Sequence, residues 1–115
     1  MDRSRFISGL NGPVKFNKGQ RQAIIDRILK HYNWKTQCTV AMEELAELQQ
    51  QVSKQIRGYD DPIGLLEEMA DVYICLDYLK SIFNIDEKDL YKAIDVKLKR
   101  GENVLNREER KQRNE

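Results

Sequence analysis

The stretch Pro62-Ile-Gly-Leu-Leu-Glu-Glu-Met-Ala-Asp-Val-Tyr-Ile-Cys-Leu-Asp-Tyr-Leu-Lys-Ser-Ile-Phe83 decides the fold. Its apolar residues recur at helical spacing but cover much more than one stripe, which predicts a helix that is buried on several sides. In a chain of only 115 residues, a helix this apolar indicates contact with other subunits. Glu68 and Asp71 interrupt the apolar surface and need a partner or a metal, since a buried carboxylate is costly on its own.

Three further helices are predicted along the chain. Apolar residues at helical spacing predict one from residue 18 to about residue 32 and another from about residue 35 to residue 57. Gly58 follows the last periodic residue and marks a helix end. Asp86 is a suitable N-cap for a final helix that runs to about residue 99. The sequence carries no strand-like alternation, so we predict an all-α protein.

The length and the pattern together predict one domain with two extensions. A chain of this size is a single domain by the usual prior. We expect the helical domain to span residues 18–101, after an irregular N-terminal arm, residues 1–17. The highly charged C-terminal tail, residues 102–115, is expected to be either a frayed helix or disordered.

Composition limits the classes of partner. The formal net charge of +1 argues against binding nucleic acid by bulk electrostatics. No apolar run approaches the roughly 20 residues that span a bilayer, and no signal peptide is evident, so we expect no membrane partner and a cytoplasmic location. Cys38 and Cys75 lack a C-x-x-C spacing and fit reduced thiols better than a disulfide.

Five carboxylates fall into two groups, each within a predicted helix. Glu43, Glu44 and Glu47 form the first group, and Glu68 and Asp71 form the second. Residues three apart lie on the same side of a helix, so Glu44 projects with Glu47, and Glu68 projects with Asp71. These two acidic couples converge if the helices pack face to face. Mg²⁺ takes oxygen ligands and would relieve the repulsion between the four converging carboxylates. The alternative for the first group is an ordinary solvated helix face.

Other residues are candidates for the chemistry of such a site. Glu43 lies about 100° round the helix from its neighbour, so it is a candidate general base; the alternative is pairing with a nearby cation. Lys54, Lys97 and Arg100 are candidates for neutralising phosphate charge, although the last two also suit a helix C-terminus. Trp34 is a candidate for stacking on a base, with packing as the alternative.

These residues resemble the signature of the MazG-like nucleoside triphosphate pyrophosphohydrolases, in the all-α NTP pyrophosphatase superfamily. The resemblance rests on Glu-Glu-x-x-Glu at residues 43–47 and Glu-x-x-Asp at residues 68–71, with Lys-Leu-Lys-Arg at residues 97–100. It covers roughly residues 33–105. The two motifs in order are fairly specific to the superfamily, but they do not settle the substrate.

The resemblance implies a four-helix-bundle-like fold that forms a homodimer or homotetramer through apolar helices. It implies hydrolysis of a nucleoside triphosphate to the monophosphate and pyrophosphate with Mg²⁺, for which Mn²⁺ can substitute. It also implies roles for eight residues: metal ligands Glu44, Glu47, Glu68 and Asp71, base Glu43, and phosphate contacts Lys97, Arg100 and Asn103.

Two departures and two alternatives accompany the resemblance. The N-terminal arm and the charged tail have no family counterpart, and the sequence after Arg100 is looser than the family pattern, which leaves Arg107 as a candidate third basic contact. One alternative is a relative specific for dUTP, dCTP or phosphoribosyl-ATP. The other is a non-catalytic helical oligomerisation module.

Overall fold

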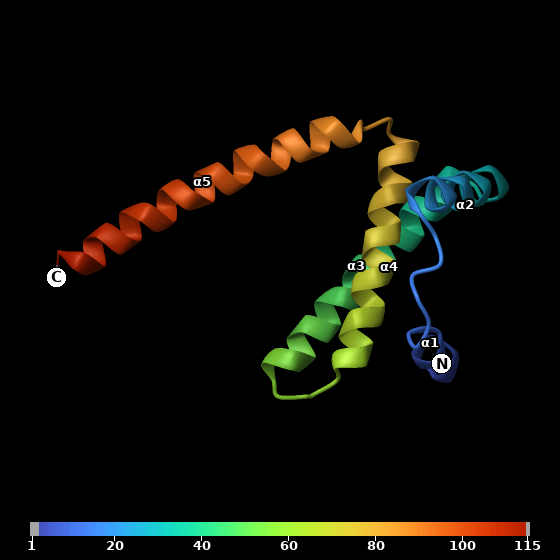
Figure 1. Ribbon diagram of the computed structural model, residues 1–115, viewed down its shortest axis with the longest axis horizontal. Helices are drawn as coiled ribbons and strands as arrows, with labels where there is room; N and C mark the ends of the chain where they lie inside the picture. Colours follow the sequence, from blue (N-terminus) through green and yellow to red (C-terminus); the bar gives the residue numbers. More distant parts are fainter. Residues whose placement is uncertain (1–2, 115) are drawn as a thin grey trace. The chain divides into compact units, whose positions relative to one another are not determined.

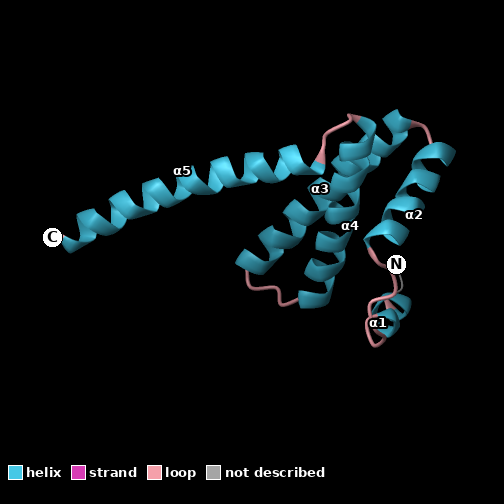
Figure 2. Cartoon of the chain, turned by 45° about the horizontal axis from the view of Figure 1, so that its top comes forward, coloured by secondary structure: helices cyan, strands magenta, loops and turns pink. Residues whose placement is uncertain are grey.

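The computed structural model describes residues 3–114 and contains five helices over that range (Figure 1). Every other described residue lies in a loop or turn, as the secondary-structure colouring shows (Figure 2). The prediction of an all-α protein is therefore confirmed. The helices are α1 (Ser4–Gly9), α2 (Lys18–His31), α3 (Trp34–Ile56), α4 (Pro62–Ile82) and α5 (Glu87–Arg113).

The helix ends follow local chemistry. Asn17 caps α2 in a capping box, in which its side chain accepts from the Gln20 backbone N–H and the Gln20 side chain accepts from the Asn17 backbone N–H. Asn33 caps α3, and Asp61 caps α4 just before Pro62. These polar side chains satisfy backbone N–H groups that have no partner inside the helix. They account for the observed starts of these helices, which lie within one residue of the predicted starts.

Helices α3 and α4 form an antiparallel hairpin (Figures 1 and 2). Its loop turns at Gly58, whose φ of 93° lies in the left-handed region that favours glycine. Near the other end, α2 packs on α4. The buried core there consists of Ile25, Ala41, Cys75 and Tyr78.

The chain divides into two compact units, one ending at Phe83 and one beginning at Asn84. The first contains α1 to α4. The second is α5 with its preceding turn, and within the described chain nearly all of its residues are exposed.

The N-terminal arm is not irregular throughout, contrary to the prediction. Residues Ser4–Gly9 form α1, and Arg3 just before this helix forms an ion pair with Asp61 at the start of α4. The helix is six residues long and contains no buried residue. It is too short to show a helical period in the sequence.

The predicted end of the last helix is also wrong. Helix α5 continues through Gly101 and the charged tail to Arg113, where the prediction ended it near residue 99. Gly101 costs helix stability but does not break the helix. Ion pairs at i,i+3 support the charged part: Lys99 with Glu102, and Lys111 with Glu108.

Helix α4 is buried on one side, not on several, within the single chain. Its buried residues are Gly64, Val72, Cys75 and Tyr78. Large apolar side chains elsewhere on the helix remain 42–69% exposed: Leu66, Met69, Tyr73, Ile74 and Leu76.

Within the described residues, we find no helix with both the length and the apolar character needed to cross a membrane.

Candidate metal centre

Three carboxylates from two helices meet in the middle of the α3–α4 hairpin. Glu44 comes from α3, and Glu68 and Asp71 come from α4, one helical turn apart. One oxygen from each lies within 4.8 Å of the others. Antiparallel packing brings the i,i+3 couple of α4 opposite Glu44, as the sequence pattern requires. We refer to these three residues as the acidic cluster.

The oxygen spacing fits a small divalent cation. Mg²⁺ binds oxygen at about 2.1 Å, so oxygens on opposite sides of the ion lie about 4.2 Å apart. The three carboxylate oxygens lie within 4.8 Å of one another, which is close to that separation.

Two oxygens of the acidic cluster need a partner. Glu44 Oε2 and Glu68 Oε2 are buried, and neither has a hydrogen-bond partner within the described part of the chain. An unsatisfied buried polar atom costs about 1–3 kcal/mol, and charge increases the cost. A cation between these oxygens would supply the missing interaction.

The electrostatics show that the cluster resists ionisation without a cation. Desolvation, followed by the charges of Glu47 and Glu44, raises the pKa of Glu68 from its ordinary 4.5 to about 7. Desolvation is also the largest cause that raises the pKa of Glu44 and the pKa of Asp71. The three carboxylates therefore hold protons more tightly than isolated ones, and a bound cation would reverse this effect.

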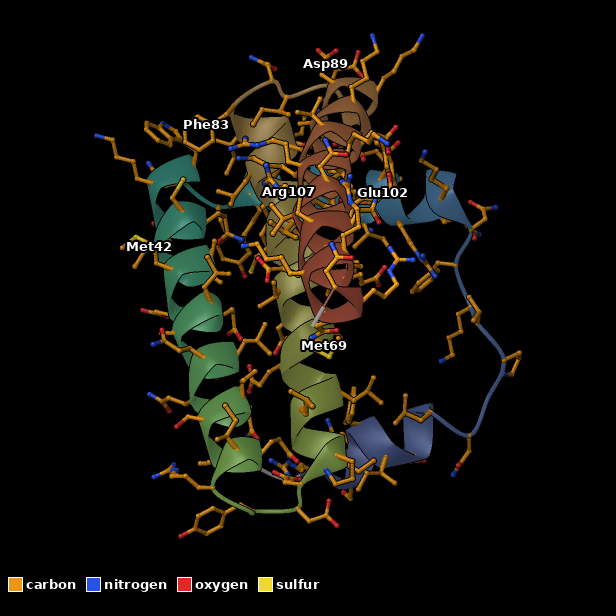
Figure 3. All side chains as sticks on the ribbon, turned by 90° about the vertical axis from the view of Figure 1, so that its left-hand side faces the viewer. Met42, Met69, Phe83, Asp89, Glu102 and Arg107 are labelled. Carbon is orange, nitrogen blue, oxygen red and sulfur yellow. The ribbon has the colours of Figure 1, made fainter. Side chains whose placement is uncertain are left out.

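The other two predicted carboxylates lie at the edge of the cluster. Glu47 is exposed and outside the set of three, yet its charge contributes to the raised pKa of Glu44, Glu68 and Asp71. Glu43 is exposed on α3, one position before Glu44. On the same helix, Met42 is 70% exposed and projects from the outer side of the hairpin (Figure 3). Only part of the acidic segment therefore faces α4.

The seam between α3 and α4 stays polar from the cluster toward the loop. Gln51 is 7% exposed, and its Oε1 atom is buried without a hydrogen-bond partner among the described residues. Gln55 Nε2 is also buried without a hydrogen-bond partner among the described residues. On the other side of the cluster, desolvation and the charges of Glu44 and Asp71 raise the pKa of Cys75 to about 11, so its thiol stays protonated.

Trp34 lies at the far end of α3 from the loop. Its ring meets Phe83 edge to face with centroids 6.2 Å apart, and both line a hollow of about 450 Å³ with Leu29, Ser81 and Ile82. Ten residues of helix separate Trp34 from Glu44, which is a rise of about 15 Å. The tryptophan is half exposed, so it is available for stacking but is not beside the carboxylates.

The predicted cations lie in both compact units. Lys54 is exposed near the end of α3, and its charge helps to lower the pKa of Asp61. Lys97, Arg100 and Asn103 follow one another at steps of three along α5 and are exposed, as is Arg107.

Arg3 is a cation near the cluster that the sequence analysis missed. It pairs with Asp61 and lies 3.6 Å from Glu67 on α4. Its partner Asp61 is 58 positions away in the sequence, and no local pattern around residue 3 marks the contact.

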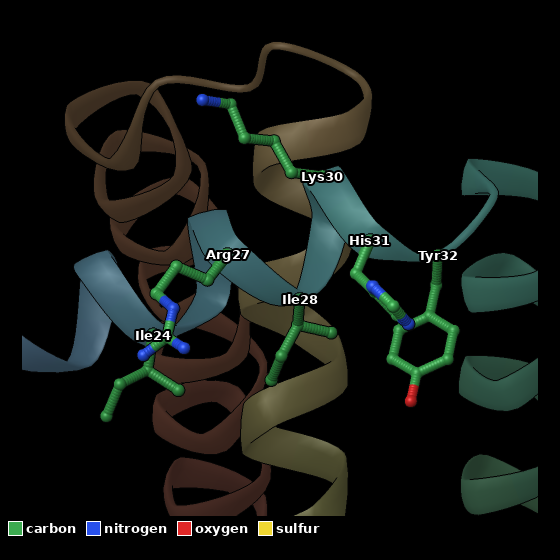
Figure 4. A pocket seen from close by; sticks show the side chains of 6 residues that line it. All are labelled: Ile24, Arg27, Ile28, Lys30, His31 and Tyr32. Carbon is green, nitrogen blue, oxygen red and sulfur yellow. The ribbon is translucent and has the colours of Figure 1, made fainter.

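A second hollow on the surface, about 720 Å³, lies along α2 (Figure 4). It is lined by Ile24, Arg27, Ile28, Lys30, His31 and Tyr32. None of the predicted site residues contributes to it, and it carries no carboxylate.

Comparisons with known proteins identify no relative. No family model matches the chain, and neither a curated protein nor a solved structure is similar to it.

Proposed function

We propose that this protein is a Mg²⁺-dependent nucleoside triphosphate pyrophosphohydrolase, with Mn²⁺ as a substitute, which converts a (d)NTP to the (d)NMP and pyrophosphate. The observation that carries the proposal is the acidic cluster: three carboxylate oxygens within 4.8 Å, from two helices, with two carboxylate oxygens buried and unpartnered among the described residues. Oxygen-rich sites of this kind hold Mg²⁺ together with substrate phosphates. The resemblance of residues 43–47 and 68–71 to the MazG-like signature supports the same reaction.

Each residue of the site has a role in this proposal. Glu44, Glu68 and Asp71 bind the cation, and Glu47 completes the set from the next turn of α3. When bound there, a divalent cation would polarise phosphate oxygens and make a bound water more acidic. Glu43 accepts the proton of the attacking water. The water oxygen bonds to the α-phosphorus, and the bond from that phosphorus to the bridging oxygen breaks, which releases pyrophosphate.

The remaining predicted residues bind the substrate. Lys54 of α3 is a phosphate contact in this proposal, and Lys97, Arg100 and Asn103 of α5 remain candidate phosphate contacts, since cations and N–H donors stabilise the charge of the leaving pyrophosphate. Trp34 stacks on the base across the hollow that it shares with Phe83.

We also infer a MazG-like helical bundle that is completed by a second copy of the chain. The support is the exposed apolar surface of α4, which includes Leu66, Met69, Tyr73 and Leu76 at steps of three and four. The proposed state is a homodimer or a homotetramer. The free thiols of Cys38 and Cys75 support a reducing compartment such as the cytoplasm.

The test is a panel of nucleotides with detection of pyrophosphate. The purified chain is incubated with Mg²⁺ and with dUTP, dCTP, dATP or 8-oxo-dGTP, and the Glu44→Ala and Asp71→Ala variants are assayed in parallel. We expect release from at least one nucleotide and a loss of at least about 100-fold in both variants. Glu109→Ala, an exposed acidic residue of α5, is the matched control and should retain activity. Absence of pyrophosphate from the whole panel contradicts the proposal.

The exposed apolar surface of α4 also favours a second candidate, a non-catalytic helical oligomerisation module. The two candidates differ in their response to ligand. A ligand that binds only the folded state raises the melting temperature. A rise with Mg²⁺ and a nucleotide together supports the enzyme, and no rise supports the module.

A further inference from the structure

Arg3 and Asp61 form an ion pair at the loop end of the hairpin. Arg3 Nη1 donates to Asp61 Oδ1 at 2.9 Å, and Nη2 donates to Oδ2 at 3.1 Å. This two-point geometry holds the guanidinium in one plane and one orientation. Asp61 also caps α4 by accepting from the Gly64 backbone N–H at 3.0 Å. The arginine is therefore fixed to the first turn of the helix that carries Glu68 and Asp71.

Gly64 makes room for this pair. Gly64 is buried, and a Cβ at this position would lie 2.7 Å from Arg3 Nη2 and would overlap the Asp61 carboxylate. A larger residue would displace both side chains from the surface of α4. The absence of a side chain at position 64 thus creates the space in which the guanidinium sits.

This location is next to the acidic cluster. Gly64 and Glu68 are one turn apart on the same side of α4, a rise of about 6 Å. The hydrogen bond to Asp61 and the charge of Asp61 raise the pKa of Arg3, and the charges of Glu67 and Glu68 add to that rise. Lys54 acts on Asp61 from α3. Two cations therefore stand between the cluster and the loop.

We propose that Arg3 is a phosphate-binding residue of the site, which holds the pyrophosphate end of the nucleotide at the loop end of the hairpin. The proposal rests on the proposed function. A guanidinium carries five N–H donors. Two of them bond to Asp61, and Nε lies 3.6 Å from Glu67 Oε2, so a second N–H on each of Nη1 and Nη2 is left for phosphate oxygens. The Arg3 side chain is 40% exposed, so an entering phosphate reaches it.

The carboxylates of the hairpin repel the phosphates of a nucleotide. The hairpin presents Glu44, Glu47, Glu68 and Asp71 to a ligand that is itself strongly negative. Metal ions offset part of this repulsion. Arg3 shares its charge with Asp61 and Glu67, so it contributes N–H donors to the leaving group and not a free unit charge. Asp61 orients the arginine in this arrangement without contacting the phosphate.

Two variants separate phosphate binding from a structural role. Arg3→Gln removes the cation. Asp61→Asn weakens the ion pair but keeps the guanidinium, and asparagine remains a good N-cap for α4. The full-length chain is titrated with inorganic pyrophosphate in the presence of Mn²⁺, and binding of Mn²⁺ alone is measured separately.

We expect Arg3→Gln to weaken pyrophosphate binding by at least about 10-fold, to leave Mn²⁺ binding within about 2-fold, and to raise KM for the triphosphate. Asp61→Asn should retain pyrophosphate affinity within about 3-fold. Arg3→Lys keeps the charge but loses the planar set of N–H donors that phosphate oxygens accept from, so it should fall between Arg3→Gln and the wild type. Equal melting temperatures for Arg3→Gln and Asp61→Asn would show that a difference in their pyrophosphate affinity does not come from a difference in stability.

The outcomes distinguish this proposal from the proposed function. If Arg3→Gln and Asp61→Asn weaken pyrophosphate binding equally, or if neither does, the assignment of Arg3 is wrong while the site remains. If the wild-type chain binds neither Mn²⁺ nor pyrophosphate and releases none from a triphosphate, the proposed function fails, and the assignment fails with it.

Discussion

The two halves of the α3–α4 hairpin use the same pair of helices for opposite purposes. The core half, at the end where α2 packs, buries Ile25, Ala41, Cys75 and Tyr78 together. The acidic half, from Glu44 toward the loop, places carboxylates and glutamines in the seam, and four of their buried polar atoms have no partner within the described residues.

The difference separates a half that stabilises the fold from a half that holds the proposed site. Burial of apolar area stabilises the core half. In the acidic half, polar groups replace apolar ones between α3 and α4. Such groups cost free energy when they are buried without a hydrogen-bond partner. Such a cost is typical of functional sites, where local stability is lost to position reactive groups. Substitutions in the two halves should therefore have opposite effects on stability.

The largest effect on stability is expected in the core half. Ile25→Ala should lower the free energy of unfolding by about 2–4 kcal/mol, because Ile25 is 6% exposed and the substitution leaves a cavity against α3 and α4. The melting temperature, measured by circular dichroism, should fall by about 10 °C. Ile56→Ala is the matched control, since Ile56 is 82% exposed, and it should change stability by less than about 0.5 kcal/mol. Equal losses for the two variants would contradict this placement of the core.

The acidic half should respond in the opposite direction. Glu68→Gln removes a charge from the repelling cluster, so the metal-free protein at pH 8 should become more stable by about 1–2 kcal/mol. The same variant should bind Mn²⁺ at least about 10-fold more weakly. Glu43→Gln is the control for stability, because Glu43 is exposed and outside the cluster. A lower melting temperature for Glu68→Gln would show that the Glu68 carboxylate stabilises the fold without metal.

The α3–α4 seam was largely predictable because its signals are local. Periodic apolar residues and Gly58 placed α2, α3 and α4 within about two residues of their observed ends. The i,i+3 spacing brought Glu68 and Asp71 to one side of α4, and antiparallel pairing brought Glu44 to them. The sequence did not separate Glu47 from this set, because its exposure depends on the angle at which α3 faces α4.

The parts that were not predicted depend on long-range contact or on weak local preference. The ion pair between Arg3 and Asp61 spans 58 positions, and no sequence period reports it. Helix α5 continues past Gly101 because charged helix formers and i,i+3 pairs outweigh one glycine, which an apolar pattern does not register. The sequence pattern of α4 predicts burial on several sides but does not say which sides are buried within the chain and which are left for another subunit.

The pH dependence of stability should distinguish the two halves further. The pKa of Glu68 is raised from 4.5 to about 7, so between these values the folded chain holds a proton that the unfolded chain has released. The stability that this proton provides is complete below pH 4.5 and is lost as pH rises toward 7. The pKa of Asp61 is lowered from 3.8, so its contribution to stability is present above pH 3.8 and is lost as pH falls below that value.

Metal-free wild-type protein should therefore melt several degrees lower at pH 7.5 than at pH 5. The Glu68→Gln variant should show a flatter profile, and addition of Mg²⁺ should restore stability mainly above pH 7, where the carboxylates are ionised. The measurement is a series of thermal melts from pH 5 to pH 8 with and without Mg²⁺. A profile for Glu68→Gln that matches the wild type would assign the pH dependence to other groups.

The smallest effect is expected at Gln51, which lies between the acidic cluster and the loop. Gln51 is 7% exposed, and its buried Oε1 atom has no partner among the described residues, so Gln51→Leu should raise the free energy of unfolding by about 1 kcal/mol. Gln50→Leu, at an exposed neighbouring position, should have almost no effect. If Gln51 serves only the fold, Mn²⁺ affinity is unchanged in Gln51→Leu. A gain in stability together with weaker Mn²⁺ binding would instead extend the functional part of the seam by two turns of α3. The amide oxygen of Gln51 would then contribute to ligand binding at a cost to the stability of the hairpin.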